Sequence, residues 1–393
     1  MLAHSPPLPL VIDYAEEDTD ITAEDEEAII LALEQRDRVR RIRFNLPALK
    51  LQKLITAIDG EYPILEYLIL ADPPEDSDTV VILPETLQAP HLRHLTIICS
   101  IPIRSPLLGT AAGLANLQLG LYHPTTYFQP TVLLQWLSLM PQLEMLLINF
   151  HFNVRNHDVE RQLMRTPITT HVTLPNLRFF VLRAVSAYSE AVFSRITAPR
   201  LEIFPIGYPN QLTFSVPQLV QFIRRTEYLR FDRAKFYFSS EQVTVKSNPP
   251  VTNMLLPAFS INVDCWHLDW QVSSVAQIFD ALRQIFSAVE DLTFRHEVHS
   301  RSSEEHNEVD RTEWRKLLRS FSNVKTLRIE DGLVGELSRC LRLEDGEHPL
   351  ELLPELQYLT YSGSGNANDA FTPFIDARQN AGRPVTLITD GGH

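Results

Sequence analysis

One spacing of apolar residues, L-x-x-L-x-L, recurs along almost the whole chain and limits how it can fold. In the segment MPQLEMLLI, residues 140–148, it is formed by Leu143, Leu146 and Ile148. A Pro stands two residues before the first motif position in six of the copies. The eleven copies begin at Val39, Leu65, Leu92, Leu114, Leu143, Leu177, Leu201, Thr226, Val289, Val324 and Leu356. So many copies in one chain indicate an internal repeat.

Each copy is typical of a short strand with one buried face. Side chains alternate between the two faces of a strand, so the fourth and sixth motif positions point together into a core. Most copies begin 22 to 35 residues apart, which leaves room for a helix or a loop in each unit. Such a unit buries its apolar side only by stacking on its neighbours. We therefore predict an α/β, leucine-rich-repeat-like solenoid, with a curved parallel sheet inside and helices and loops outside.

The interval between Thr226 and Val289 is 63 residues, so we predict one degenerate unit there with its strand at 259–263. Thr22 and Asp25 have the spacing of a capping pair for a helix that ends near Glu34. A last strand is expected at 385–388, and loops at 151–170, 239–250 and 295–310. Further helices are predicted at 49–59, 131–140, 217–225, 273–289 and 314–321, and the segment 370–382 carries the apolar residues Phe371, Phe374 and Ile375.

Charge is distributed unevenly along the chain. Residues 1–35 hold ten carboxylates and no Lys or Arg. This segment therefore carries ten of the 14 net negative charges of the chain. We predict an acidic N-terminal segment with one helix at 1–35, of which 1–21 is a solvated lead-in, followed by the repeat solenoid at 36–393. Five arginines lie between Arg36 and Phe44. We expect them to pair with the acidic helix rather than with phosphate, and we expect no nucleic-acid partner.

Composition also limits the location of the protein. No run approaches about 18 uninterrupted apolar residues, so no membrane span or membrane partner is expected. The first residues do not resemble a signal peptide. Three cysteines, Cys99, Cys265 and Cys340, are far apart and odd in number, which favours buried thiols in a reducing compartment. A cytoplasmic or nuclear location follows as the expectation.

Patterns that carry catalysis or bind cofactors are not apparent in this chain. His296, His299 and His306 lie in a polar segment that favours solvated side chains over a metal site. Neither a phosphate-binding loop nor a nucleophile elbow occurs. We therefore predict no enzyme activity, no catalytic residue, no metal and no cofactor.

The third and fifth motif positions face away from the core and vary most. In the middle strands they are apolar, where a solvated face would carry polar groups. This indicates a protein-binding face, unless the 151–170 segment folds over it. The expected partner-binding residues are Met145, Leu147, Phe179, Val181, Ile203, Tyr228, Arg230, Arg41 and Arg43.

Several segments resemble the leucine-rich-repeat region of F-box proteins from mushroom-forming fungi. These are PLPLVIDY at 7–14, ITAEDEEAIILALEQRDRVRRIRF from Ile21, YPILEYLIL from Tyr62, the phrases LPNLR and APRLE, and FIDARQNAGRPVTL at 374–387. The resemblance implies a substrate receptor of a cullin-based ubiquitin ligase, in which the repeats hold a protein substrate and the F-box docks the adaptor subunit. The F-box itself is expected upstream of the repeats, and residues 1–35 hold too few apolar residues for its three helices.

Two functions follow from this resemblance and from the repeats. The first is a non-catalytic protein-recognition module that resembles the substrate-binding part of an F-box subunit. The alternative is a structural or decoy interaction protein without coupling to a ubiquitin ligase. Binding of the ligase adaptor would separate the two, whereas the identity of the substrate and the oligomeric state are not encoded in these motifs.

Overall fold

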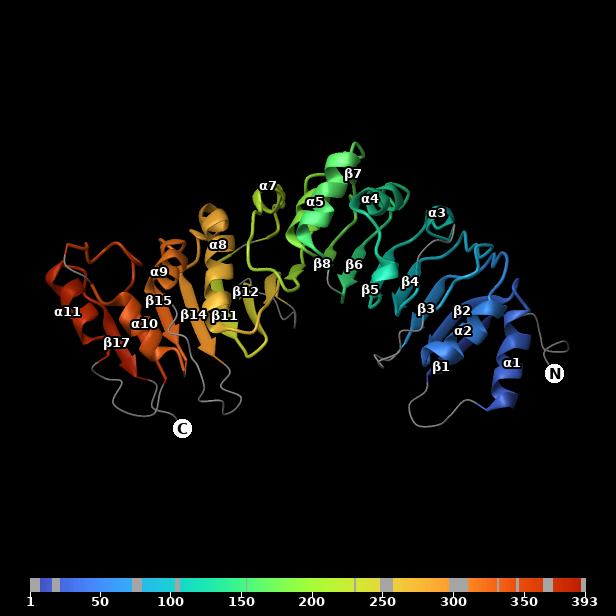
Figure 1. Ribbon diagram of the computed structural model, residues 1–393, viewed down its shortest axis with the longest axis horizontal. Coiled ribbons are helices and arrows are strands. Elements are labelled where there is room, and N and C mark those ends of the chain that lie inside the picture. Colours follow the sequence, from blue (N-terminus) through green and yellow to red (C-terminus); the bar gives the residue numbers. More distant parts are fainter. Residues whose placement is uncertain are drawn as a thin grey trace. The chain divides into compact units, whose positions relative to one another are not determined.

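The computed structural model describes residues 8–15, 22–72, 80–102, 107–152, 154–229, 231–247, 257–296, 310–330, 332–343, 346–362 and 370–389. The predicted loop at 295–310 lies mostly outside these ranges. The chain forms two compact units, unit 1 at Met1–Leu201 and unit 2 at Glu202–His393 (Figure 1). Each unit is a sheet with helices, so the chain is a mixed α/β protein whose strands are mostly parallel.

The strands of unit 1 pair in chain order and are all parallel in their described pairings. They are β1 (Leu10–Ala15), β2 (Val39–Asn45), β3 (Tyr67–Ala71), β4 (His94–Ile98), β5 (Asn116–Leu121), β6 (Met145–Phe150) and β8 (Phe179–Arg183). A separate parallel pair joins β7 (Val172–Thr173) to β9 (Ile196–Thr197). The helices are α1 (Ala23–Leu33), α2 (Ala48–Ala57), α3 (Leu107–Thr110), α4 (Pro130–Ser138), α5 (Asn156–Arg165), α6 (Ser186–Phe193) and the 3-10 turn η2 (Pro124–Thr126).

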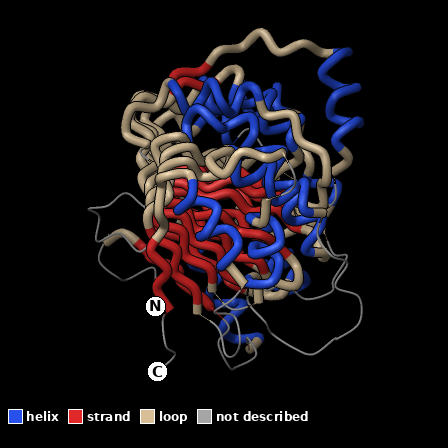
Figure 2. The backbone as a smooth tube through the Cα atoms, turned by 90° about the vertical axis from the view of Figure 1, so that its left-hand side faces the viewer, coloured by secondary structure: helices blue, strands red, loops and turns tan. Residues whose placement is uncertain are grey.

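The repeat motif places one side chain per strand at the same level of the core. Motif position four forms a row in which neighbours are direct register partners, and every member from β2 onward is fully buried. This row is Ile42, Leu68, Leu95, Leu117, Leu146 and Phe180. Position six forms a second row, also fully buried. Helices pack against this side of the strands, which are drawn in red in Figure 2. The predicted core positions of unit 1 are thus confirmed.

The acidic N-terminal segment contributes a strand to the sheet. Residues Leu10–Ala15 were expected in a solvated lead-in, and this expectation is wrong, because they form β1 beside β2. The amide of Leu10 donates to the Arg38 carbonyl at 2.6 Å, and Ile12 is 7% exposed. The predicted helix after it is confirmed, since the Thr22 and Asp25 side chains cap α1 reciprocally. Leu8, before β1, is exposed as expected, and the parts of the lead-in at 1–7 and 16–21 lie outside the described residues.

Unit 2 departs from the predicted parallel order. Its strands are arranged as β10 (Phe204–Tyr208), β13 (Phe259–Asp264), β12 (Gln242–Ser247), β11 (Arg233–Phe238), β14 (Asp291–His296), β15 (Thr326–Ile329), β16 (Tyr358–Tyr361) and β17 (Thr386–Thr389). The central strand β12 runs antiparallel to β11 and to β13. The predicted loop at 239–250 is therefore wrong over β12, whereas the strands predicted at 259–263 and 385–388 are confirmed.

The repeat copy that begins at Thr226 does not form a strand. Thr226, Leu229 and Phe231 are buried as the motif predicts, but the chain turns there, after the end of the preceding helix. The strand forms at β11 instead, where Ala234, Phe236 and Phe238 alternate as buried residues. This copy of the motif therefore predicts the buried residues correctly but places the strand too early in the sequence.

Aromatic residues fill much of the core of unit 2. Phe236 lies 5.0 Å from Phe294 and 5.1 Å from Phe279, measured between ring centroids. The helices that pack there are α7 (Pro217–Arg224), α8 (Leu268–Phe286), α9 (Arg311–Arg319), α10 (Val334–Leu341) and α11 (Thr372–Asn380). Helix α8 begins five residues before the predicted Ser273. The helices α3, α5, α6, α10 and α11 were not predicted, and α5 lies within the predicted loop at 151–170.

Adjacent leucines on β6 separate the two faces of the unit 1 sheet and give a matched test of the fold. Leu146→Ala should lower the free energy of unfolding by about 2–5 kcal/mol, because Leu146 is fully buried. Leu147→Ala should lower it by about 1 kcal/mol or less, because Leu147 is half-buried on the other face. Urea unfolding followed by circular dichroism measures both values. Equal losses would contradict the assignment of the two faces.

Candidate functional site

The face of the unit 1 sheet opposite the core carries two rows of half-buried side chains, which we call the open face. Motif position three supplies Arg41, Tyr67, His94, Asn116, Met145 and Phe179, in register across β2 to β8. Position five supplies Arg43, Ile69, Thr96, Gln118, Leu147 and Val181 in the same way. Residues 22 to 34 positions apart in sequence therefore become neighbours across this sheet.

The β1–β2 end of the open face is charged, and its charges are partly compensated. Asp13 on β1 lies 3.5 Å from Arg41 and 3.8 Å from Arg43, between carboxylate oxygen and guanidinium nitrogen. Arg40 pairs with Glu66 on the neighbouring repeat at 2.9 Å. The expectation that these arginines pair with the acidic helix is therefore wrong for all three. Such exposed pairs add little stability, so Arg41 and Arg43 remain able to exchange partners.

The middle of the open face is aromatic and polar. The rings of Tyr67 and His94 stack in parallel, with centroids 4.3 Å apart and an interplanar angle of 3°. The Asn116 amide nitrogen lies 2.6 Å from Nδ1 of His94, and Gln118 Nε2 donates to Met145 Sδ at 3.3 Å. Burial, followed by the charge of Arg93, lowers the pKa of His94. These contacts hold His94 as a neutral ring with Nδ1 as an acceptor.

The β6–β8 end of the open face is apolar. Met145 and Leu147 are the register partners of Phe179 and Val181, and all four side chains are half-buried. The described part of the 151–170 insertion packs on the helical side, where α5 contacts α6. There Asn156 Oδ1 accepts the Ala187 amide at 2.7 Å. The four apolar side chains keep part of their surface open, and they form the strongest candidate for a binding site.

The remaining predicted site residues fall elsewhere. Ile203 is half-buried directly before β10, in unit 2. Tyr228 is 60% exposed in the turn after α7, so its expected position on a strand is wrong. Arg230 lies outside the described residues. The sequence reasoning also left out Tyr67, His94, Asn116 and Gln118, although their motif positions identify them as members of the same two rows.

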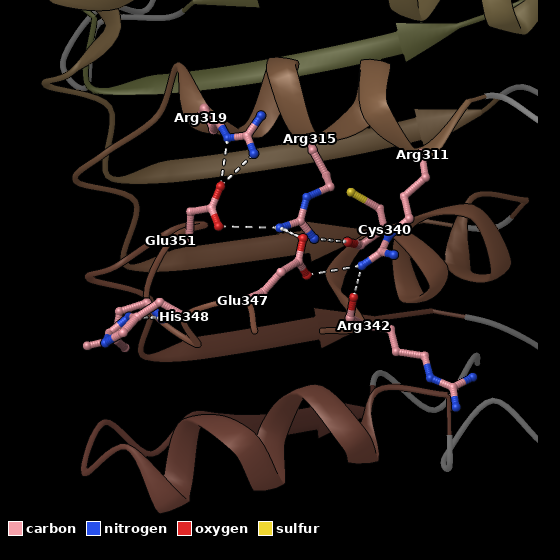
Figure 3. Close-up of polar contacts among 9 residues, drawn as sticks. Arg311, Arg315, Arg319, Cys340, Arg342, Glu347, His348 and Glu351 are labelled. Carbon is pink, nitrogen blue, oxygen red and sulfur yellow. Dashed lines mark hydrogen bonds and ion pairs between the residues drawn. The ribbon is translucent and has the colours of Figure 1, made fainter. Parts of the chain in front are cut away.

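A second group of charges, at the C-terminal part of unit 2, holds the fold together. Arg311, Arg315 and Arg319 lie one turn apart on α9 and point at Glu347 and Glu351, as Figure 3 shows. The distances from Arg315 are 2.8 Å to Glu347 and 3.7 Å to Glu351, and its Nη1 donates to the Cys340 carbonyl at 3.3 Å. The Arg319 hydrogen bond lowers the pKa of Glu351. Since every one of these arginines already contacts an acceptor of the chain itself, the cluster reads as structural.

Reactive groups are scarce among the described residues. All three cysteines are free and buried, as predicted, and burial raises the pKa of the Cys265 and Cys340 thiols to about 12. Within the described ranges, His, Cys, Asp and Glu side chains do not gather into a metal-binding group. His299 and His306 lie outside those ranges. No helix in the described part of the chain combines the length and apolarity needed to cross a bilayer.

No known family model matches the chain, and a search of the curated proteins finds no significant match.

The contacts of His94 predict how it titrates. Its midpoint should lie below about 6.5, the ordinary value for histidine, because burial and Arg93 disfavour the charged ring. The folded chain then binds fewer protons than the unfolded chain, so this group makes stability fall as pH drops through that window. Proton NMR of the imidazole resonances, assigned with His94→Gln, measures the midpoint. A midpoint at or above 6.5 would contradict the neutral, stacked ring.

The arginine cluster predicts a difference between a buried and an exposed ion pair. Arg315 is 5% exposed, and Arg315→Met should lower the free energy of unfolding by about 3–5 kcal/mol, because Glu347 loses its closest cation. Arg339→Met is the control, since the Arg339 side chain, which pairs with Glu336, is about half exposed, and it should cost about 1 kcal/mol or less. Urea unfolding of the two variants provides the comparison, and equal losses would show that burial does not matter at Arg315.

Proposed function

We propose that the open face of unit 1 binds a protein partner and that the chain is a non-catalytic recognition module of the leucine-rich-repeat F-box type. In this proposal the strands and helices form a leucine-rich-repeat-like solenoid whose inner face is the binding surface. The observation that carries it is the apolar patch of Met145, Leu147, Phe179 and Val181, on adjacent strands and only half-buried. Adjacent apolar side chains on an open sheet are costly in water unless a partner covers them.

The rest of the open face suits protein recognition. Protein interfaces combine a small apolar centre with a polar rim, and they are enriched in Tyr, Met, Phe and Arg. Here the apolar patch is continued by Gln118 and Asn116, then by the stacked pair of Tyr67 and His94. Because the side chains are fixed by register and by mutual contacts, little rotamer freedom is lost on binding.

Coupling to a ubiquitin ligase is the second part of the proposal, and it rests on the resemblance of the repeat segments. A direct test is a pull-down of the purified chain with the ligase adaptor subunit. Binding at micromolar affinity or better would support the receptor role. A chain that captures a partner through the open face but not the adaptor would instead be an interaction protein without ligase coupling.

The apolar patch gives the sharpest test of partner binding. The double variant Leu147→Asp/Val181→Asp should lose about tenfold or more of the protein captured from extracts of the native cell, because it places two charges in the centre of the interface. Met164→Asp is the matched control, since Met164 is 84% exposed on α5, and it should leave capture unchanged. Quantitative mass spectrometry of the captured proteins gives the readout.

A photo-crosslinking residue keeps this test independent of folding defects. Benzoylphenylalanine at position 147 should crosslink the same protein that the double variant loses, whereas the same residue at position 164 should not. If the double variant, shown to be folded by circular dichroism, captures that protein as well as the native chain does, the open face is not the binding site.

A further inference from the structure

Two tryptophans near the start of α8, in unit 2, are exposed although tryptophan is largely buried on average. Trp266 is 65% exposed and Trp270 is 44% exposed, whereas Trp314 in the same unit is fully buried. The exposed ring of His267 lies edge-on to Trp270, with centroids 4.6 Å apart. These three residues, which we call the aromatic platform, lie where the chain leaves β13.

The backbone beneath the aromatic platform is fixed by a buried side chain. Gln271 is 1% exposed, and its Nε2 donates to the carbonyls of Ser239 and Cys265, both at 2.8 Å. The Cys265 amide donates to the Glu241 carbonyl at 3.0 Å. The backbone beneath the platform is therefore tied to the turn between β11 and β12.

The surroundings of the aromatic platform are acidic. Asp264 and Asp269 flank it in sequence, and both charges act on the Cys265 thiol between them. Glu241 is exposed on the turn that is tied to Cys265. The sequence has no Lys or Arg from Phe236 to Val245 or from Ser247 to Leu282. Carboxylates with no cation nearby in sequence give this surface a negative potential.

We propose that the aromatic platform binds a basic peptide segment of a partner, with a Lys or Arg side chain over the indoles and the carboxylates beside it. A guanidinium or ammonium group is attracted to the face of an indole, and Trp is the strongest ring for this contact. Arg also stacks its planar group on aromatic faces. The surface lies in unit 2 and is separate from the open face, so it goes beyond the proposed function and does not depend on it.

A fluorescein-labelled nonapeptide of arginine is the probe, and fluorescence anisotropy measures its binding to the full chain at low salt. Trp266→Ala/Trp270→Ala should weaken binding about tenfold or more, given the energy of two cation–π contacts. Glu241→Gln/Asp269→Asn should weaken it about threefold to tenfold through lost attraction. Trp266→Phe/Trp270→Phe should retain part of the affinity, because the rings remain.

The matched control removes the same charge at another place. Glu24→Gln/Glu27→Gln changes two exposed carboxylates of α1 and should leave the affinity within about twofold of the native value, because that helix is not part of the platform. The inference is overturned if the double Ala variant binds the peptide as tightly as the native chain. It is equally overturned if the α1 control weakens binding as much as the Glu241/Asp269 variant. It is also overturned if the double Ala variant loses binding to neutral phosphatidylcholine vesicles or to maltoheptaose but not to the peptide.

Discussion

The structure of unit 1 depends on one constraint, the stacking of one apolar side chain per strand at a common level of the core. A single strand with its helix cannot remove its apolar side from water, and only an in-register neighbour completes the burial. The row from Leu68 through Leu117 to Phe180 shows the result, because every member has no exposed surface. Shifting any strand by one residue would turn its buried side chains onto the opposite face. Register and burial therefore fix each other.

The same constraint builds the candidate site. Since the core rows are in register, the residues between them are in register too. The open face is therefore made of two rows of side chains that run across the strands. Its side chains change in character along the strand order, from the Asp13–Arg41 pair, through the Tyr67–His94 stack, to the apolar patch on β6 and β8. In unit 2 the corresponding face carries Lys235 and Lys246 as register partners on β11 and β12.

How far the sequence predicts this structure follows from how local each signal is. The motif located β2 to β6, β8, β10 and β14 to β16, because the spacing of its apolar residues can be read within about ten residues. It missed β1, because LVIDYA lies among carboxylates and its value to the fold comes only from pairing with β2. It missed β12, because QVTVKS carries no copy of the motif and is stabilised by pairing antiparallel with β11, which precedes it, and with β13, which follows it. Tyr228 was misplaced because the strand forms seven residues after Thr226, at β11.

Arginine shows why composition alone misleads about function. Arg315 and Arg378 are buried, and their guanidinium groups already contact acceptors of the chain itself. Arg378, with no exposed surface, donates to the carbonyls of Leu353, Pro354 and Leu356 at 3.0 to 3.2 Å. It satisfies carbonyls of the turn before β16, of which that of Leu353 also accepts the Leu356 amide at 3.0 Å. Function in this chain is therefore better sought at side chains that remain exposed and are not needed for the fold. These are the apolar patch of unit 1 and the exposed indoles of the aromatic platform in unit 2.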